Sequence, residues 1–522
     1  MSSYTVLLDV WLDHARSMSD GSFLVDLWME QARLIKTMDH ELSLVSAMAF
    51  LVLVFFVSGK LTFSFISWLS GWKDAKTEWN RTQIVSCALL LFLACELPAW
   101  LSTPHEGLAD LLQGTDPKLN EILERVPAIQ RGPSPPILFR NRHVQFLPFM
   151  IQNEFHRLQG IPFQRLEVDV TDCLNKLVGC DYPVMNDTIT LDVFPPFDET
   201  SEYSRNFNKS SPVILYAPGL RSNSQDLPGN SVVRRAYEAG FRSIVVNRRG
   251  HTPNQPLKSP RWNLYGDADD MEQVYWHLKD NWVTEKTPFL LYGVSSGTAV
   301  TVSAVEKWDK RRRLMESPDE RIPSFVAFIV VSPGYDVSKV LTRERFLWPY
   351  NDLLMSGVKE HFVRQNEDLL REHDDHAVDR MLTASSLQDF VDASVRFAGY
   401  DNTTLFYQDL NPVNEFRDIS TPTLVLNAKD DPCCVIGNLY ENSPYPGHDN
   451  KTFAEMIQET ERGMVAVAHT GSHCPFLCMR DRWLPLTRDP LVGGWMLNNW
   501  ADEVTIDYFK AALDVYSERL NL

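Results

Sequence analysis

Short apolar runs alternate with amphipathic stretches along the chain from residue 166 onward. The runs end at glycine, proline or polar residues, as buried strands do, and the stretches between them have helical periodicity. Strands that alternate with helices over short links predict a mostly parallel sheet with helices on both faces. Eight strands are expected, the first two as an antiparallel pair, at 166–170, 188–193, 213–217, 243–247, 289–292, 325–331, 423–427 and 464–468.

One interval, residues 334–421, breaks this alternation. It is helical in character, notably at 351–361 and 386–397, and it separates two expected strands. Because long insertions in a compact domain usually have a function, we predict a helical cap over an active site. The alternative is a pair of surface helices without a role. The α/β domain that carries the insertion is expected at 137–515.

The N-terminal region, residues 1–102, has the pattern of a helical membrane-associated segment. Residues 42–59 are uncharged, and a helix of that length crosses a hydrocarbon core of about 30 Å. The run starts too far from the N-terminus, and lacks the basic leader, for a signal peptide. A second apolar run at 84–101 contains Glu96 and Pro98, so it is expected to be a second span, an interfacial helix or a helix packed on the domain. Residues 103–136, rich in proline and polar residues, are predicted to be a linker.

Overall composition limits the classes of partner. The chain has 522 residues, of which 44% are hydrophobic and 23% charged, and its net charge is -18. The composition is that of a globular protein, and the acidic balance argues against nucleic acid binding. The eight cysteines contain no C-x-x-C pair, so neither a metal nor a cofactor is expected. Cys173 and Cys180 could close a small disulfide loop or could equally be free thiols.

A five-residue pattern, Gly293-Val294-Ser295-Ser296-Gly297, follows one of the expected strands. In this G-x-S-x-G elbow a strand turns so sharply into a helix that the serine is strained, which requires small residues two before and two after it. The elbow predicts Ser295 as a nucleophile. The alternative is a serine and glycine turn that closes a buried strand.

A serine hydroxyl needs a histidine to take its proton and a carboxylate to orient that histidine. In α/β-hydrolases the acid and then the histidine follow later strands. Asp430 and Asp431 follow strand 423–427, while His469 and His473 follow strand 464–468. We favour Asp431 because a proline after it turns the chain over the sheet edge, and His473 because glycine and serine before it allow a tight loop. Asp430 and His469 remain the alternatives.

The tetrahedral intermediate of acyl transfer also needs amide donors for its oxyanion. One expected donor is the backbone N–H of Ser296, the residue after the nucleophile. The other is the N–H of Leu220, because Pro218-Gly219-Leu220 follows strand 213–217 and the glycine lets the chain approach closely. An ordinary turn glycine is the alternative for Gly219.

A set of motifs in fixed order resembles a known family. They are 140–145 (R-N-R-H-V-Q), 218–220, 247–250 (N-R-R-G), Asp270 with His277, the elbow, 427–432 and 471–473. Over residues 135–500 they resemble the membrane-anchored abhydrolase-domain proteins, the α/β-hydrolase branch related to bacterial YheT-type hydrolases and yeast fatty acid ethyl ester synthases. The chain departs from that pattern at Pro218, where a histidine is usual, at Ser296, where methionine is frequent, and in an insertion at 440–453.

The resemblance implies an α/β-hydrolase fold, an N-terminal membrane anchor and lipid ester substrates. We therefore expect a serine esterase or lipase anchored by one span or a hairpin, in the endoplasmic reticulum or another endomembrane. An acyltransferase of the same fold and a catalytically silent scaffold are the alternatives. The H-x-x-x-x-D spacing of His105 and Asp110 matches some acyltransferases, but it lies in the expected linker and such a match arises by chance.

Overall fold

The computed structural model describes residues 106–517 except for short internal gaps. The gaps are 137–138, 159, 174–183, 227–228, 253–254, 315–320, 343–344, 347–349, 413–415, 417–418, 443–449 and 480–484. The predicted membrane region with its runs at 42–59 and 84–101 lies outside the described residues, as do His105 and Cys180. Within the described part, no helix combines the length and the apolar character needed to cross a bilayer.

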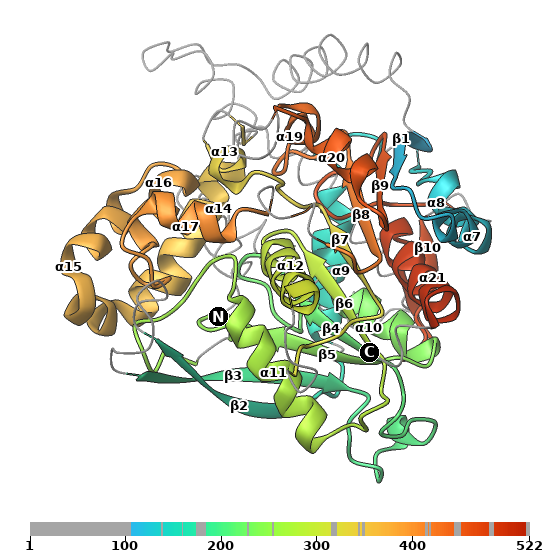
Figure 1. Ribbon diagram of the computed structural model, residues 1–522, viewed down its shortest axis with the longest axis horizontal. Coiled ribbons are helices and arrows are strands. Elements are labelled where there is room, and N and C mark those ends of the chain that lie inside the picture. Colours follow the sequence, from blue (N-terminus) through green and yellow to red (C-terminus); the bar gives the residue numbers. More distant parts are fainter. Residues whose placement is uncertain are drawn as a thin grey trace, which may run out of the picture.

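A nine-stranded sheet forms the centre of the molecule, in the order β1-β9-β8-β7-β6-β4-β5-β3-β2 (Figure 1). Six neighbouring strands run parallel: β4 (Val213–Ala217), β5 (Arg242–Asn247), β6 (Phe289–Val294), β7 (Ala327–Val331), β8 (Thr423–Ala428) and β9 (Gly463–Ala468). All their residues are buried, which is why they read as continuous apolar runs. The mostly parallel α/β sheet predicted from the sequence is confirmed.

Antiparallel strands close both edges of the sheet. β2 (Gln164–Cys173) and β3 (Val184–Phe194) pair at one edge, and β1 (Leu108–Gln113) pairs with β9 at the other. The predicted count of eight strands is therefore wrong by one, because β1 lies in the stretch assigned to a linker. That linker is also wrong from residue 106 on: α7 (Lys118–Arg125) and α8 (Pro127–Arg131) follow β1 and bury apolar side chains. The proline-rich composition of this stretch obscured the short amphipathic pattern of α7 and α8.

Helices cover both faces of the sheet. α10 (Gly229–Glu238) and α21 (Trp500–Val515), with α7 and α8, cover one face, and α11 (Ala268–Asn281), α12 (Gly297–Leu314) and α20 (Phe453–Glu459) cover the other. Alternate residues of each strand point into the two resulting cores. The remaining elements outside the insertion between β7 and β8 are α9 (Phe146–Leu158), η3 (Glu202–Ser204), α19 (Gly437–Tyr440), β10 (Leu486–Arg488) and β11 (Trp495–Leu497).

The insertion between β7 and β8 forms a helical layer beside the sheet, at the left of Figure 1. It contains α13 (Val337–Val340), α14 (Tyr350–Val358), η4 (Lys359–Val363), η5 (Arg364–Asn366), α15 (Glu367–Thr383), α16 (Leu387–Ser394) and α17 (Thr403–Leu410). These helices share an apolar core of their own with the segment after β5. In it the rings of Trp262 and Phe362 stack with centroids 5.0 Å apart.

Candidate active site

The turn from β6 into α12 places Ser295 in a left-handed backbone conformation, with φ at 51°. A Cβ at Gly293 would lie 2.6 Å from Thr301 Oγ1, and one at Gly297 would lie 2.2 Å from the Ala217 carbonyl oxygen. Both positions therefore exclude a side chain, which is the requirement of the elbow motif. The Ser295 amide donates to the carbonyl of Val331 on β7 at 2.9 Å and ties the turn to the neighbouring strand.

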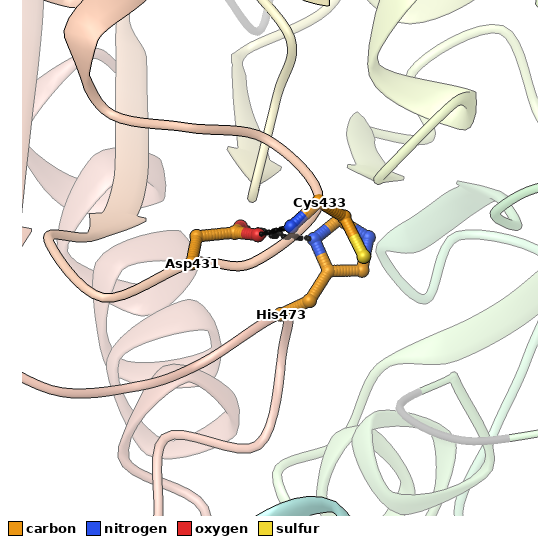
Figure 2. A group of neighbouring side chains, drawn as sticks. All are labelled: Asp431, Cys433 and His473. Atoms are coloured by element: carbon orange, nitrogen blue, oxygen red, sulfur yellow. Dashed lines mark hydrogen bonds and ion pairs between the residues drawn. The ribbon is translucent and has the colours of Figure 1, made fainter. Parts of the chain in front are cut away.

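The predicted nucleophile, base and acid lie together. His473 Nε2 is 2.8 Å from Ser295 Oγ, and His473 Nδ1 is 2.9 Å from Asp431 Oδ2. Figure 2 shows the Asp431 carboxylate facing the imidazole from the loop after β8, while His473 stands on the loop after β9. The Asp431 side chain is fully buried, and 14% of the His473 side chain is exposed. The imidazole of His473 therefore stays partly exposed to solvent beside Ser295.

Backbone amides fix the orientation of the Asp431 carboxylate. The amides of Cys433 and Cys434 both donate to its Oδ1 at 2.8 Å, and Figure 2 shows the first of these bonds. One potential metal-ligating atom from each of Asp431, Cys433 and His473 also lies within 4.8 Å of the other two, a spacing at which a metal ion could bind. The carboxylate and imidazole are already paired, however, and burial raises the pKa of the Cys433 thiol well above its usual range. Because metals bind the thiolate, we interpret the group as a hydrogen-bonded catalytic pair.

The alternative acid, Asp430, has a different partner. Its Oδ1 accepts the backbone amides of Gly471 and Ser472, both at 2.9 Å, so it holds the loop that carries His473. Burial raises the pKa of Asp430 to about 6. The alternative base, His469, lies at the end of β9, where its amide donates to the carbonyl of Gly107 at 3.2 Å. The loop role of Asp430 was not predicted, although two aspartates after one strand could have indicated two tasks.

The loop that carries His473 is tightly constrained. Ser472 and Cys474, on either side of the histidine, have φ at 50° and 84°. A Cβ at Gly471 would come within 2.3 Å of the Phe476 ring, so only glycine fits there. The Ser472 hydroxyl donates to the carbonyl of Arg142 at 2.7 Å, which connects the loop to the motif at 140–145.

The two predicted oxyanion donors lie on either side of the elbow. Gly219 packs against the nucleophile, since a Cβ there would lie 3.3 Å from Ser295 Cβ. Among the described residues, neither the Leu220 amide nor the Ser296 amide has a hydrogen bond acceptor. The 18-residue helix α12 begins directly after Ser296, so the positive end of its dipole also points at this spot. The arrangement can accept a developing negative charge.

A buried arginine that sequence reasoning left without a role contacts this region. The guanidinium of Arg248 donates to the carbonyls of Pro218 and Gly219, each at 2.9 Å. Its neighbour Arg249 instead pairs with Asp270. The N-R-R-G motif after β5 singled out both arginines, but it contained nothing that distinguished the role of Arg248 from that of Arg249.

Apolar side chains of the helical insertion reach the site. Leu220 packs against the core of the insertion, as does Cys434, and Cys433 is buried within it. Tyr350, at the start of α14, bonds through its hydroxyl to His143 Nδ1 at 3.0 Å. The insertion therefore contacts both the donor loop and the loop that carries Asp431.

Comparisons with known proteins show which family the chain is similar to. Residues 214–484 match a family model described as the alpha/beta hydrolase family. Human phospholipase ABHD3 is 27% identical over 225 residues, which cover 42% of this chain and 51% of that protein. Mouse monoacylglycerol lipase ABHD2 is 24% identical over 259 residues, covering 47% and 56%. The chain thus spans about half the length of the curated relatives it matches. Among solved structures, Est1E from Butyrivibrio proteoclasticus with ferulic acid bound has a TM-score of 0.31 and 12% identity, covering 55% of this chain and 88% of that one.

Proposed function

We propose that this chain, which belongs to the alpha/beta hydrolase family, hydrolyses carboxylic esters of lipids through an acyl-enzyme on Ser295. The family match supports the α/β-hydrolase part of the predicted fold class, and the N-terminal membrane-associated helical region stays a prediction. The observation that carries the proposal is the unbroken chain of contacts from Ser295 Oγ to His473 Nε2 at 2.8 Å and from His473 Nδ1 to Asp431 Oδ2 at 2.9 Å. It is the arrangement that activates a serine hydroxyl.

Acylation would begin at the hydroxyl of Ser295. Oγ attacks the ester carbonyl carbon as its proton moves to His473 Nε2, and Asp431 stabilises the imidazolium through Nδ1–H. The amides of Leu220 and Ser296 donate to the carbonyl oxygen as it becomes negative. The bond from carbon to the alcohol oxygen then breaks, and the alcohol leaves with the proton from Nε2.

Deacylation repeats these steps with water. His473 Nε2 takes a proton from the water while its oxygen attacks the acyl carbon. The bond to Ser295 Oγ breaks, the serine regains its proton and the carboxylic acid is released. An alcohol in place of water would make the reaction an acyl transfer, so the hydrolase and the acyl-ester synthase share every residue named above.

Lipid esters are the substrate class that the surroundings favour. The donor residue Leu220 and the residues after Asp431 belong to the apolar core of the helical insertion, which suits an acyl chain better than a polar acyl group. The names of the relatives, a phospholipase and a monoacylglycerol lipase, support the same class. We propose that the insertion is a cap, and the narrower relationship to YheT-type hydrolases and yeast synthases stays a prediction.

A membrane anchor remains part of the proposal because residues 42–59 are uncharged and long enough to span. Carbonate extraction of membranes from cells that express the full chain tests it. We expect the protein to stay in the pellet, and release into the supernatant would contradict an anchor.

The hydrolase itself is tested with purified full-length protein in detergent and a panel of monoacylglycerols and phospholipids. We expect wild type to release fatty acid from at least one ester and Ser295→Ala to release none above background. Ser303→Ala, the same change farther along α12, removes a hydroxyl that has no hydrogen bond partner among the described residues and should retain turnover. Equal release by wild type and Ser295→Ala would refute the proposal and favour a silent scaffold.

A further inference from the structure

Arg248 lies in the interior directly beyond β5, with 5% of its surface exposed. Its Nη2 donates to the carbonyls of Pro218 and Gly219 at 2.9 Å and to Ser296 Oγ at 3.1 Å. Its Nη1 donates to the carbonyl of Leu264 at 2.7 Å. One guanidinium thus contacts both segments that supply the oxyanion donors, the loop after β4 and the residue after the nucleophile.

The charge of this guanidinium is not balanced by a carboxylate. Three of the four other buried arginines pair with a carboxylate: Arg234 with Asp489, Arg249 with Asp270 and Arg261 with Asp267. The fourth, Arg242, has no carboxylate partner within the described residues; it donates to two backbone carbonyls and lies over the ring of Phe197 at 4.4 Å. Within the described part of the chain, no carboxylate forms an ion pair with Arg248, and its Nε has no hydrogen bond partner. Burying an uncompensated cation costs free energy, which indicates that its charge has a use.

The surrounding backbone is shaped to hold this side chain. Gly266 has φ at 86°, and a Cβ there would come within 2.8 Å of Arg248 Cδ. Burial lowers the pKa of Arg248 to about 9, so the group stays charged at neutral pH. The side chain is therefore a fixed cation rather than a mobile one.

We propose that Arg248 is the positioning residue of the oxyanion hole, and that its buried charge is balanced only when the ester carbonyl oxygen becomes negative. The inference rests on the proposed ester cleavage at Ser295. The carbonyl of Gly219 and the amide of Leu220 belong to one planar trans peptide, in which C=O and N–H point in opposite directions. Because Arg248 holds that carbonyl, the Leu220 amide is turned away from the arginine and is left free as a donor.

The positive charge of Arg248 contributes in addition to this orientation of the Leu220 amide. A fixed cation in a water-poor site interacts more strongly with a nearby anion than it would in water, and needs no reorganisation during the reaction. The interaction exists only while the oxygen is negative, so it should raise kcat and leave KM nearly unchanged. Loss of a single oxyanion donor lowers kcat by about 10²- to 10³-fold in other serine hydrolases, which sets the scale expected here.

The test compares full-length wild type, Arg248→Lys and Arg248→Gln on a p-nitrophenyl ester and with a trifluoromethyl ketone inhibitor. We expect kcat to fall about 10-fold in the lysine variant, which keeps the charge but loses the fork, and about 100-fold in the glutamine variant. KM should change less than about 3-fold, and the inhibitor, whose hemiketal with Ser295 carries a negative oxygen like that of the tetrahedral intermediate, should weaken in parallel with kcat/KM. Arg249→Lys is the matched control, since it changes the adjacent buried arginine, which pairs with Asp270.

Several results would overturn the proposal. One is a kcat for Arg248→Gln within about 3-fold of wild type. Another is a loss of kcat without weaker inhibitor binding, and a third is an equal loss in Arg249→Lys at an equal loss of Tm, which would mean general loosening of the fold. Should Arg248→Gln not fold, the Arg248→Lys variant decides by the same kcat, KM and inhibitor criteria. A wild type as inert as Ser295→Ala refutes ester cleavage itself, whereas an active wild type with an active Arg248→Gln refutes only the role of Arg248.

Discussion

The carboxylate of Asp430 accepts the backbone amide of Gly471 at 2.9 Å, so the aspartate beside the proposed catalytic acid fastens the loop that presents His473. Asp431 meets the imidazole of the same loop at 2.9 Å. Of these two adjacent carboxylates, that of Asp430 holds the loop and that of Asp431 orients the imidazole of His473.

This division predicts unequal effects of two matched substitutions. Asp431→Asn should lower kcat by about 10⁴-fold, because an amide cannot hold the imidazole in the required tautomer. Asp430→Asn keeps an oxygen that accepts the two loop amides, so kcat should fall less than about 10-fold. Steady-state kinetics of both variants decide. A loss in Asp430→Asn as large as that in Asp431→Asn would reassign the catalytic acid.

Asp502 on α21 predicts how stability depends on pH. It is fully buried, accepts the Asn499 side-chain amide at 3.0 Å, and burial raises its pKa from 3.8 to about 7. The folded state therefore binds more protons than the unfolded state between about pH 4 and pH 7, so this group lets stability rise as the pH falls through that range. Removing the charge should raise the free energy of unfolding at pH 8 by about 2 kcal/mol.

Urea unfolding of wild type and Asp502→Asn at pH 8 and pH 5 measures this effect. The advantage of the variant should shrink by more than half at pH 5, where wild-type Asp502 is protonated in the folded state. A difference in unfolding free energy that is the same at both pH values would show that Asp502 does not titrate in this range.

The two elbow glycines should differ in their tolerance of alanine. A Cβ at Gly297 meets the backbone carbonyls of Ala217 and Pro218 at 2.2 and 2.4 Å, whereas one at Gly293 meets the side chain of Thr301. Gly293→Ala should therefore cost about 1–3 kcal/mol of stability and be partly rescued by Thr301→Ala. A clash with backbone carbonyls cannot be relieved by shortening a side chain, so Gly297→Ala should be the more destabilising change. Thermal unfolding of the single and double variants checks the order.

Thiol reagents should not abolish the proposed ester hydrolysis. Burial raises the pKa of Cys433 well above its usual range and also raises that of Cys474, and both side chains are buried beside the site. Buried thiols in the neutral form react slowly, so N-ethylmaleimide at pH 7 should not inactivate the folded protein within an hour. Rapid inactivation that substrate prevents would instead indicate a nucleophilic cysteine.

The sequence predicted the parts of the site that follow buried strands. Ser295 comes directly after such a strand, and Asp431 and His473 lie in the loops that follow two others. The carboxyl ends of parallel strands meet at one edge of a sheet. The same local reasoning explained the glycines at 293 and 297, where neighbouring atoms leave no room for a Cβ.

What the sequence did not predict depends on contacts between distant segments. β1 pairs with β9, which comes near the other end of the domain in the sequence. The short apolar pattern of β1 could not be recognised within a proline-rich stretch. Arg248, just after β5, donates to carbonyls 30 and 29 residues earlier in the chain, a contact that the periodicity of β5 could not show. The task of Asp430 became visible only when the loop after β9 was seen against it.

Active-site labelling tests the central claim most directly. The full-length protein is treated with a fluorophosphonate, digested and analysed by mass spectrometry, beside Ser295→Ala and His473→Ala. We expect one modified peptide, with the phosphonate on Ser295, and neither variant modified above background. A wild type that stays unmodified, or a modification at any other serine, would contradict it.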